Sequence, residues 1–445
     1  MINRNSLAVL AAFLLATATA SAADAPPPPW TLDAALAEAL ARSPDARLAE
    51  QRVAAAQAML TQASSADWPQ LSLKGSYMQT NNAMMAFGSI LGQRAFSPAI
   101  NFNSPGQVDN LNLTAAVGYN IYSGGRATAG KAAARAGAEA AALDREAALA
   151  QLQTEVARAY FQIQQSQEAL RAIETAVASY EEVLRVSKLR YDSGQMLKSE
   201  LLNIEVQLAQ TREQSLIMRN NLALAGKYFL FLLGHDSAEN AGTVTLAPAS
   251  PASRIVAPPE NLTVADRPEL QAMRRRVTAA ENAVRAARGA LRPTVNAFGA
   301  YQYDKGWRLN GDSTSWAAGI QAEVPIFDGK LSRGRVREAE AEQAQAQESL
   351  RKLELALALQ LDQARLASAL AREQLAVTET LVAQADESAR ISRERFAAGS
   401  LLSAELIGVE TRLTEARMRR AVAQSAEKIA TLELRRAAGL PLLSN

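Results

Sequence analysis

Two short stretches decide the fold, YNIYSGGR at residues 119–126 and VPIFDGK at residues 324–330. Each follows a segment in which apolar and polar residues alternate, and each precedes a long segment without proline. Alternation with period two predicts a β-strand, and a long proline-free segment permits a long helix. Each stretch therefore marks a junction between a strand and a long helix.

The two junctions belong to an internal repeat that covers the chain. Seven positions from the junctions onward match at an offset of 205 residues, and four earlier positions match at an offset of 224. Tyr122 matches Phe327 at the offset of 205, and Tyr77 matches Tyr301 at the offset of 224. The chain thus consists of two copies of one unit, and the first copy has about 19 extra residues between Tyr77 and Tyr122.

The units are residues 23–234 and 267–445, joined by a Pro- and Ser-rich linker at 235–266 that includes a short strand near 243–246. Each unit is expected to contain a helix, two strands, a long helix and a returning helix. The expected strands lie near 69–80, 110–122, 293–304 and 315–327, and the expected helices near 31–66, 126–190, 197–233, 330–395 and 402–438. Either Thr31 or Ser43 is the expected N-cap of the first helix. Apolar residues recur every seven positions from Leu149 to Tyr191, as in a coiled coil. Residues 81–109 are expected to form a polar loop.

Residues 1–22 resemble a secretory signal peptide. Arg4 supplies a positive charge, residues 7–18 are apolar, and small residues follow at 20–22. A membrane anchor is the alternative, but the apolar run is shorter than the ~20 residues that span a bilayer. Since no cysteine follows, the exported chain is expected to carry no N-terminal lipid.

Composition excludes several kinds of site. The chain has no cysteine, one histidine and a net charge of +2. A cysteine nucleophile, a disulfide scaffold and a cysteine zinc site are impossible, and a nucleic-acid partner is disfavoured because the basic excess is small. His235 is expected to be structural or solvated. Met78, Met84 and Met85 could bind copper through their thioethers, but a surface role is favoured. We predict no enzyme and no cofactor.

The alternating strands pose a problem of closure. Four strands from one chain cannot close a barrel, and an open sheet edge is not tolerated in lipid. Two chains would supply eight strands, whose side chains fill the interior, and three would supply twelve, which could leave a channel. The alternative is a soluble sheet that is capped by coiled coils.

The duplicated junctions, together with the duplicated turns RYDSG at 190–194 and RFAAG at 395–399, resemble the TolC family of outer-membrane efflux proteins. The resemblance implies a homotrimer with a twelve-stranded barrel in the outer membrane of a Gram-negative bacterium and a helical tunnel in the periplasm. The linker would form an equatorial domain. It also implies a periplasmic adaptor protein and an inner-membrane transporter of the RND, ABC or MFS type as partners. A non-conducting periplasmic coiled-coil scaffold is the alternative function.

The resemblance also assigns roles to residues at the two turns. The expected adaptor contacts are Arg190, Tyr191, Gly194, Arg395, Phe396 and Gly399, although a turn without adaptor contact also explains the glycines. The expected periplasmic aperture comprises Glu200, Leu401, Leu402 and Glu405. Three copies of Glu405 would form an acidic ring, and a solvated carboxylate is the alternative. Leu401 and Gly408 depart from the charged pattern of the family, so Leu401 or Leu402 could form a hydrophobic constriction instead.

Overall fold

The structure, a computed structural model, describes residues 29–101, 103–236, 244–247, 259 and 261–442. The expected signal peptide and most of the linker lie outside these residues. The elements are α2 (Leu32–Arg42), α3 (Pro44–Ser64), the 3₁₀ turn η1 (Ser65–Asp67), β1 (Gln70–Thr80), α4 (Ala83–Gly92), β2 (Val108–Tyr122), α5 (Arg126–Asp192), α6 (Lys198–Leu233), α7 (Pro268–Gly289), β3 (Thr294–Lys305), β4 (Asp312–Glu323), α8 (Leu331–Ala397) and α9 (Ser403–Ala437).

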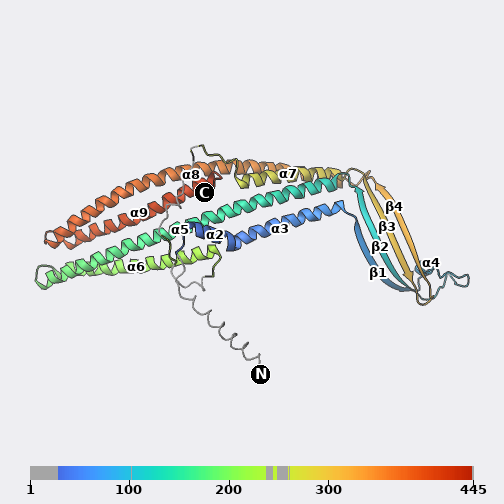
Figure 1. Cartoon of the computed structure of the whole chain (residues 1–445), viewed down its shortest axis with the longest axis horizontal. Helices are drawn as coiled ribbons and strands as arrows, with labels where there is room; N and C mark the ends of the chain where they lie inside the picture. Colours follow the sequence, from blue (N-terminus) through green and yellow to red (C-terminus); the bar gives the residue numbers. More distant parts are fainter. Residues whose placement is uncertain (1–28, 102, 237–243, 248–258, 260, 443–445) are drawn as a thin grey trace, which may run out of the picture.

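The molecule is an elongated helical layer with a sheet at one end (Figure 1). The long helices α5 and α8 run from the sheet to two tips at the opposite end, where α6 and α9 turn back. The four strands form one antiparallel sheet in the order β1-β2-β3-β4. The predicted fold class, mainly helical with four strands per chain from a duplicated unit, is confirmed.

The register of the strands separates an apolar face from a polar one. Ala115 lies opposite Leu73 on one side and Tyr301 on the other, and Tyr301 lies opposite Trp316. The same register puts a second set on the opposite face: Lys74, Thr114, Gln302 and Ser315. Leu73 and Trp316 are among the most exposed large side chains. Such an apolar surface requires a partner, because soluble monomers rarely expose large apolar patches.

Short helices stack end to end beside each long helix. A Cβ on Gly234, at the end of α6, would lie 2.7 Å from the Arg42 carbonyl oxygen, next to the start of α3. Gly439, at the end of α9, approaches Arg267 at the start of α7 in the same way, with its Cβ 3.4 Å from Arg267 Cγ. The two joints therefore occur at corresponding positions of the two repeats.

The helix expected at 31–66 is two helices, α2 and α3, and each of the two candidate N-caps, Thr31 and Ser43, begins one of them. Ser43 interrupts it with a ψ of 134°, outside the helical range, and caps α3 by accepting a hydrogen bond from the Asp45 N–H at 3.4 Å. Pro44 then occupies the first turn of α3, where its missing N–H costs nothing. The break lets α2 leave the axis of α3 and pack on α5 and α6.

Two other segments differ from the sequence prediction. The fourth strand, expected at 315–327, begins earlier at Asp312 and ends at Glu323, so Val324 and Ile326 lie beyond it, because Pro325 cannot donate to a ladder. The supposed polar loop at 81–109 contains the helix α4, which Asn82 caps by accepting from the N–H groups of Met84 and Met85. The other long helices end within two residues of the predicted positions.

The main apolar core lies midway along the helices. Trp30, Tyr160 and Phe229 pack there against one another, and Trp30 also bridges to Leu246 of the linker. His235 Nε2 lies 3.1 Å from Glu38 Oε1 at the edge of this core, which is a structural role. Among the residues that the structure describes, no helix combines the length and apolarity needed to cross a bilayer.

Candidate functional site at the helical tips

The two tips, residues 190–201 and 395–406, have the same backbone geometry. In the first, the Gly194 N–H donates to the Tyr191 carbonyl at 2.9 Å and the Gln195 N–H to the Arg190 carbonyl at 2.8 Å. In the second, Gly399 donates to Phe396 at 3.0 Å and Ser400 to Arg395 at 2.9 Å. This is the Schellman motif, whose glycine adopts a left-handed conformation, here with φ of 74° and 78°. The glycines therefore close both turns, whatever else contacts them.

Arg190 joins one tip to the other. Its Nη1 donates to the Phe396 carbonyl oxygen at 3.0 Å, and its guanidinium carbon lies 5.5 Å from the centre of the Phe396 ring. Arg190 is half-buried. Its counterpart Arg395 is exposed. The repeat therefore provides one arginine that ties the hairpins together and one that faces outward.

A small apolar cluster fills the space between the hairpins. It consists of Val183, Met196, Ile204, Phe396 and Leu406, with Leu401 packed against it. Phe396 is only 3% exposed. Its side chain is therefore part of the tip core, and it offers its ring to Arg190 rather than to a partner on the surface.

The remaining predicted tip residues are distributed over the surface. Leu402 is 58% exposed and Glu405 is exposed, whereas Leu401 and Glu200 are half-buried. Tyr191, Gly194 and Gly399 are exposed. The tip thus presents Leu402 and Glu405 near one another at the start of α9, where an acid is favoured by the helix dipole.

An ion pair with a buried carboxylate, which the sequence did not indicate, lies just above the second tip. Arg393 of α8 holds Glu410 of α9 with two hydrogen bonds, one of which joins Nη2 to Oε2 at 2.8 Å. The Glu410 side chain is 2% exposed. The hydrogen bond with Glu410 raises the pKa of Arg393 above its usual value. Because the two residues lie on different helices across a turn, no helical spacing linked them in the sequence.

Two further contacts join α5 to α9 above the tips. The Tyr180 hydroxyl donates to the Ile407 carbonyl at 3.3 Å, and burial raises the pKa of this tyrosine. Nearer the sheet, the Ser425 hydroxyl donates to the Phe161 carbonyl at 3.2 Å. The hairpins are therefore tied to each other at several levels.

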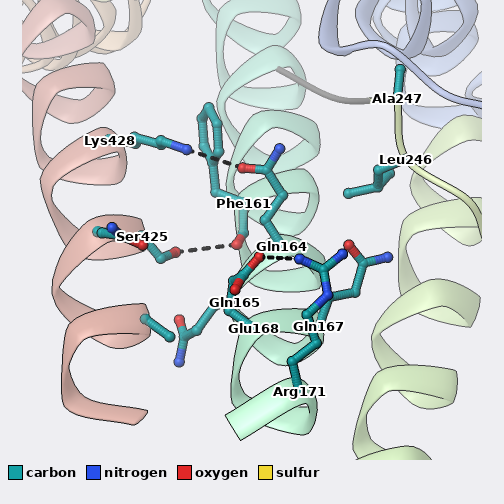
Figure 2. A pocket seen from close by; sticks show the side chains of 12 residues that line it. Phe161, Gln164, Gln165, Gln167, Glu168, Arg171, Leu246, Ala247, Ser425 and Lys428 are labelled. Atoms are coloured by element: carbon teal, nitrogen blue, oxygen red, sulfur yellow. Dashed lines mark hydrogen bonds and ion pairs between the residues drawn. The ribbon is translucent and has the colours of Figure 1, made fainter. Parts of the chain in front are cut away.

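The Ser425 contact borders a cleft of about 370 Å³ between α5, α9 and the linker (Figure 2). Lys428 Nζ donates to Gln164 Oε1 at 3.1 Å and lies 5.2 Å from the centre of the Phe161 ring. Burial lowers the pKa of Lys428. No group of metal-ligating side chains occurs among the described residues. The cleft reflects packing between the hairpins.

A family model settles the classification. The model described as outer membrane efflux protein matches residues 35–235 and 261–440, which together form most of the chain. The chain belongs to this family. The family predicted from the duplicated junctions and turns is confirmed.

Solved structures of channels from this family have the same fold. VceC from Vibrio cholerae is 21% identical with a TM-score of 0.76, and the match covers 92% of this chain and 96% of that one. CmeC from Campylobacter jejuni is 17% identical with a TM-score of 0.81, covering 92% and 85%. The open state of MtrE from Neisseria gonorrhoeae is 17% identical with a TM-score of 0.75, covering 93% and 89%. No curated protein sequence matches the chain.

The predicted site residues of this outer membrane efflux protein all lie at the two tips. The two hairpin turns lie at the end of the molecule that is farthest from the sheet (Figure 1). They bring together the six expected adaptor-contact residues and the four expected aperture residues. Phe396 and Leu401 belong to the apolar core of the tip, and the others reach its surface.

Proposed function

We propose that this efflux protein forms a homotrimeric channel that spans the outer membrane. It would passively conduct substrates to the cell exterior from an inner-membrane transporter and a periplasmic adaptor. The helices form a tunnel in the periplasm, and the sheets of three chains form a twelve-stranded barrel. One observation carries this proposal, namely that both layers of the chain end in open edges.

The open edges occur on the same two sides in both layers. Strands β1 and β4 pair on one side only. In the helical layer, α5 lies in the interior, with α3 and α6 on one side and α7 and α9 on the other. Among the described elements, helix α8 contacts only α7 and α9 to any extent, so it forms one open edge, and α3 and α6 form the other. Two unlike edges on one chain form a head-to-tail interface, which closes into a ring when the rotation fits. Three chains of four strands give the barrel that can hold a channel.

The free edge of α8 is apolar. Leu355, Leu366 and Val377 are eleven residues apart from one to the next, and so are Leu359, Leu370 and Leu381. All six are exposed in the single chain. An eleven-residue repeat corresponds to about 3.67 residues per turn, which is close to the 3.6 of an α-helix. The six apolar side chains therefore stay on nearly the same side of a straight helix. A nearly straight seam suits helices that line a tunnel.

The sheet has the dimensions of a membrane barrel. Its strands have 11 to 15 residues, and about 9–11 suffice for a tilted strand to cross a bilayer. The face with Leu73, Tyr301 and Trp316 would contact lipid, and the face with Lys74 would line the lumen. Tyr77 and Trp307, with ring centres 6.1 Å apart, stand at one border as in an aromatic belt.

At the tips, the exposed Leu402 and Glu405 form the proposed aperture, supported by Leu401 in the core and by Glu200 on the neighbouring hairpin. Leu402 supplies a hydrophobic constriction, and three Glu405 carboxylates favour cations. The exposed Tyr191, Gly194, Arg395 and Gly399 form the proposed adaptor contact, and Arg190 and Phe396 support them from beneath. The family and the fold are those of channels, and we propose no enzymatic activity.

Measurements on the purified protein in detergent and in planar bilayers test this function. The channel predicts a mass of three chains and discrete conductance steps, and Leu402→Ser or Glu405→Ala should increase the conductance. A coiled-coil scaffold would be soluble without detergent and would give no steps. A water-soluble monomer of the processed chain would contradict the proposal.

A further inference from the structure

Helix α4 distinguishes the first repeat from the second, since it occupies the segment that contains the extra residues. It lies at the end of the sheet that is farthest from the helices (Figure 1). In the proposed orientation this end faces the cell exterior. Helix α4 is therefore placed at the outer mouth of the barrel.

One side of α4 packs on the sheet. Ala86 and Ile90 are 0% exposed, and they cluster with Val108 at the start of β2. Gln93, directly after α4, donates through Nε2 to the Asp109 carbonyl at 2.6 Å and to Asn110 Oδ1 at 2.9 Å. The helix is thereby fixed to the strands by apolar contacts and by a buried amide.

These contacts are on the polar face of the sheet. Asn110 donates to Asp304 Oδ1 at 2.7 Å, and Asn112, which pairs with Asp304 in the register, donates to the same oxygen at 2.9 Å. A Cβ on Gly92 would lie 3.5 Å from the Asp304 carboxyl carbon. The helix thus lies on the side that lines the lumen, away from the face that contacts lipid.

The other side of α4 is apolar and exposed in the single chain. Met84 is 81% exposed, and Met85 and Leu91 are each 49% exposed. Residues 81–93 contain no charged side chain. An apolar helix surface of this kind is unfavourable in a water-filled mouth unless another apolar surface covers it.

We propose that the α4 helices of three protomers meet around the channel axis and form an apolar constriction at the outer mouth. The exposed apolar side of each α4 is covered by the α4 helices of the other two protomers, since all three helices face one lumen. This inference rests on the proposed trimeric channel. A hydrophobic constriction can close a pore by excluding water, so α4 would restrict the mouth until substrate separates the helices.

Cross-linking tests the meeting of the helices in the intact trimer. The chain has no cysteine, so Met84→Cys introduces a single thiol, and Leu73→Cys on the lipid face is the matched control. A short bis-maleimide, which adds to one thiol at each end, should convert most of the Met84→Cys protein into denaturation-resistant dimers. It should leave the control as monomers on denaturation. Native trimers of Met84→Cys that give no dimers would overturn the inference.

Labelling from outside tests the constriction independently of the periplasmic tip. Ser76→Cys puts a thiol on the lumen face of β1, and a bulky polyethylene glycol maleimide is added to intact cells. Adding Met84→Asp and Leu91→Asp should increase the labelling rate severalfold, whereas adding Leu73→Ser should not. An unchanged rate in correctly assembled trimers contradicts the constriction alone. Failure of the unaltered chain to form trimers contradicts the channel itself, and the inference with it.

Discussion

The hairpins α5–α6 and α8–α9 have nearly the same lengths but different surroundings. Three ion pairs recur at corresponding positions of the two hairpins, which shows how well the repeat is preserved: Glu182–Arg185 with Glu387–Arg390, Glu181–Arg212 with Asp386–Arg417, and Lys188–Glu205 with Arg393–Glu410. Phe161 of α5 is buried, however, whereas its counterpart Leu366 of α8 is 73% exposed. The difference marks α5 as the interior of one protomer and α8 as its border.

The largest expected effect comes from Leu366→Asp, which puts a charge on the α8 edge. We expect the trimer to be lost, because a carboxylate buried against an apolar neighbour is costly unless it is paired. Light scattering in detergent measures the mass. Ala367→Asp is the matched control, since it adds the same charge at the next exposed position outside the stripe. Trimers that persist with Leu366→Asp would place the interface elsewhere.

The next effect distinguishes the two versions of one repeated ion pair. Arg393→Ala leaves the buried Glu410 without its partner, which should destabilise the protein by about 2 kcal/mol, less than for a pair buried on both sides because the Arg393 side chain is 41% exposed. Lys188→Ala removes the exposed counterpart, whose atoms are 3.9 Å apart, and should cost less than about 1 kcal/mol. Thermal unfolding followed by circular dichroism compares the two variants. Equal shifts in Tm would show that burial of Glu410 does not matter.

A third comparison uses the two tip arginines. Arg190→Ala removes the hydrogen bond to the Phe396 carbonyl and the contact with its ring, so the hairpins should separate more easily and conductance should rise. Arg395→Ala should leave conductance unchanged and weaken adaptor cross-linking, because this side chain is exposed. Single-channel recording and cross-linking give both readouts. A conductance change in Arg395→Ala alone would reverse the assignment.

The smallest effect concerns the two helix joints. Burial opposes ionisation of Glu269, but its hydrogen bonds with Arg267 prevail, and the net result is a pKa below the usual 4.5. The unfolded chain therefore binds this proton first as the pH falls. The pair stabilises the fold above pH 4.5, and this stability, about 1 kcal/mol, is lost as the pH falls through the lowered pKa.

Glu269→Gln should accordingly flatten the dependence of Tm on pH in the acid range. Asp45→Asn, at the corresponding position of the first joint, is the matched comparison. Melting curves recorded below and above pH 4.5 measure the effect. A slope that Glu269→Gln does not change would assign the acid sensitivity to other carboxyl groups.

The sequence predicted the features that depend on periodicity and repetition. Alternation identified the strands, and the proline-free segments located the long helices. It missed α4, because a short and mostly apolar run without polar alternation gives no helical stripe in a segment rich in Asn and Gly. It also treated α2 and α3 as one helix, although it offered Ser43 as an N-cap beside Thr31. A proline directly after an N-cap residue is typical of a helix start, and here it marks the start of α3.

The tip shows the same limit for a functional site. Matching turns located all the candidate residues, but the burial of Phe396 and the packing of Leu401 depend on how two distant hairpins meet. The pair Arg393–Glu410 was invisible for the same reason. Periodicity along one helix shows which side is apolar, and it cannot show which neighbour covers that side.

The joints between the short helices have a mechanical consequence. Helix α6 gives way to α3, and α9 to α7, at one height, where only α5 and α8 continue unbroken. Both unbroken helices follow directly on a strand of the sheet. A twist applied at the tips would therefore reach the sheet through α5 and α8 alone, and the short helices would be free to shift at their joints.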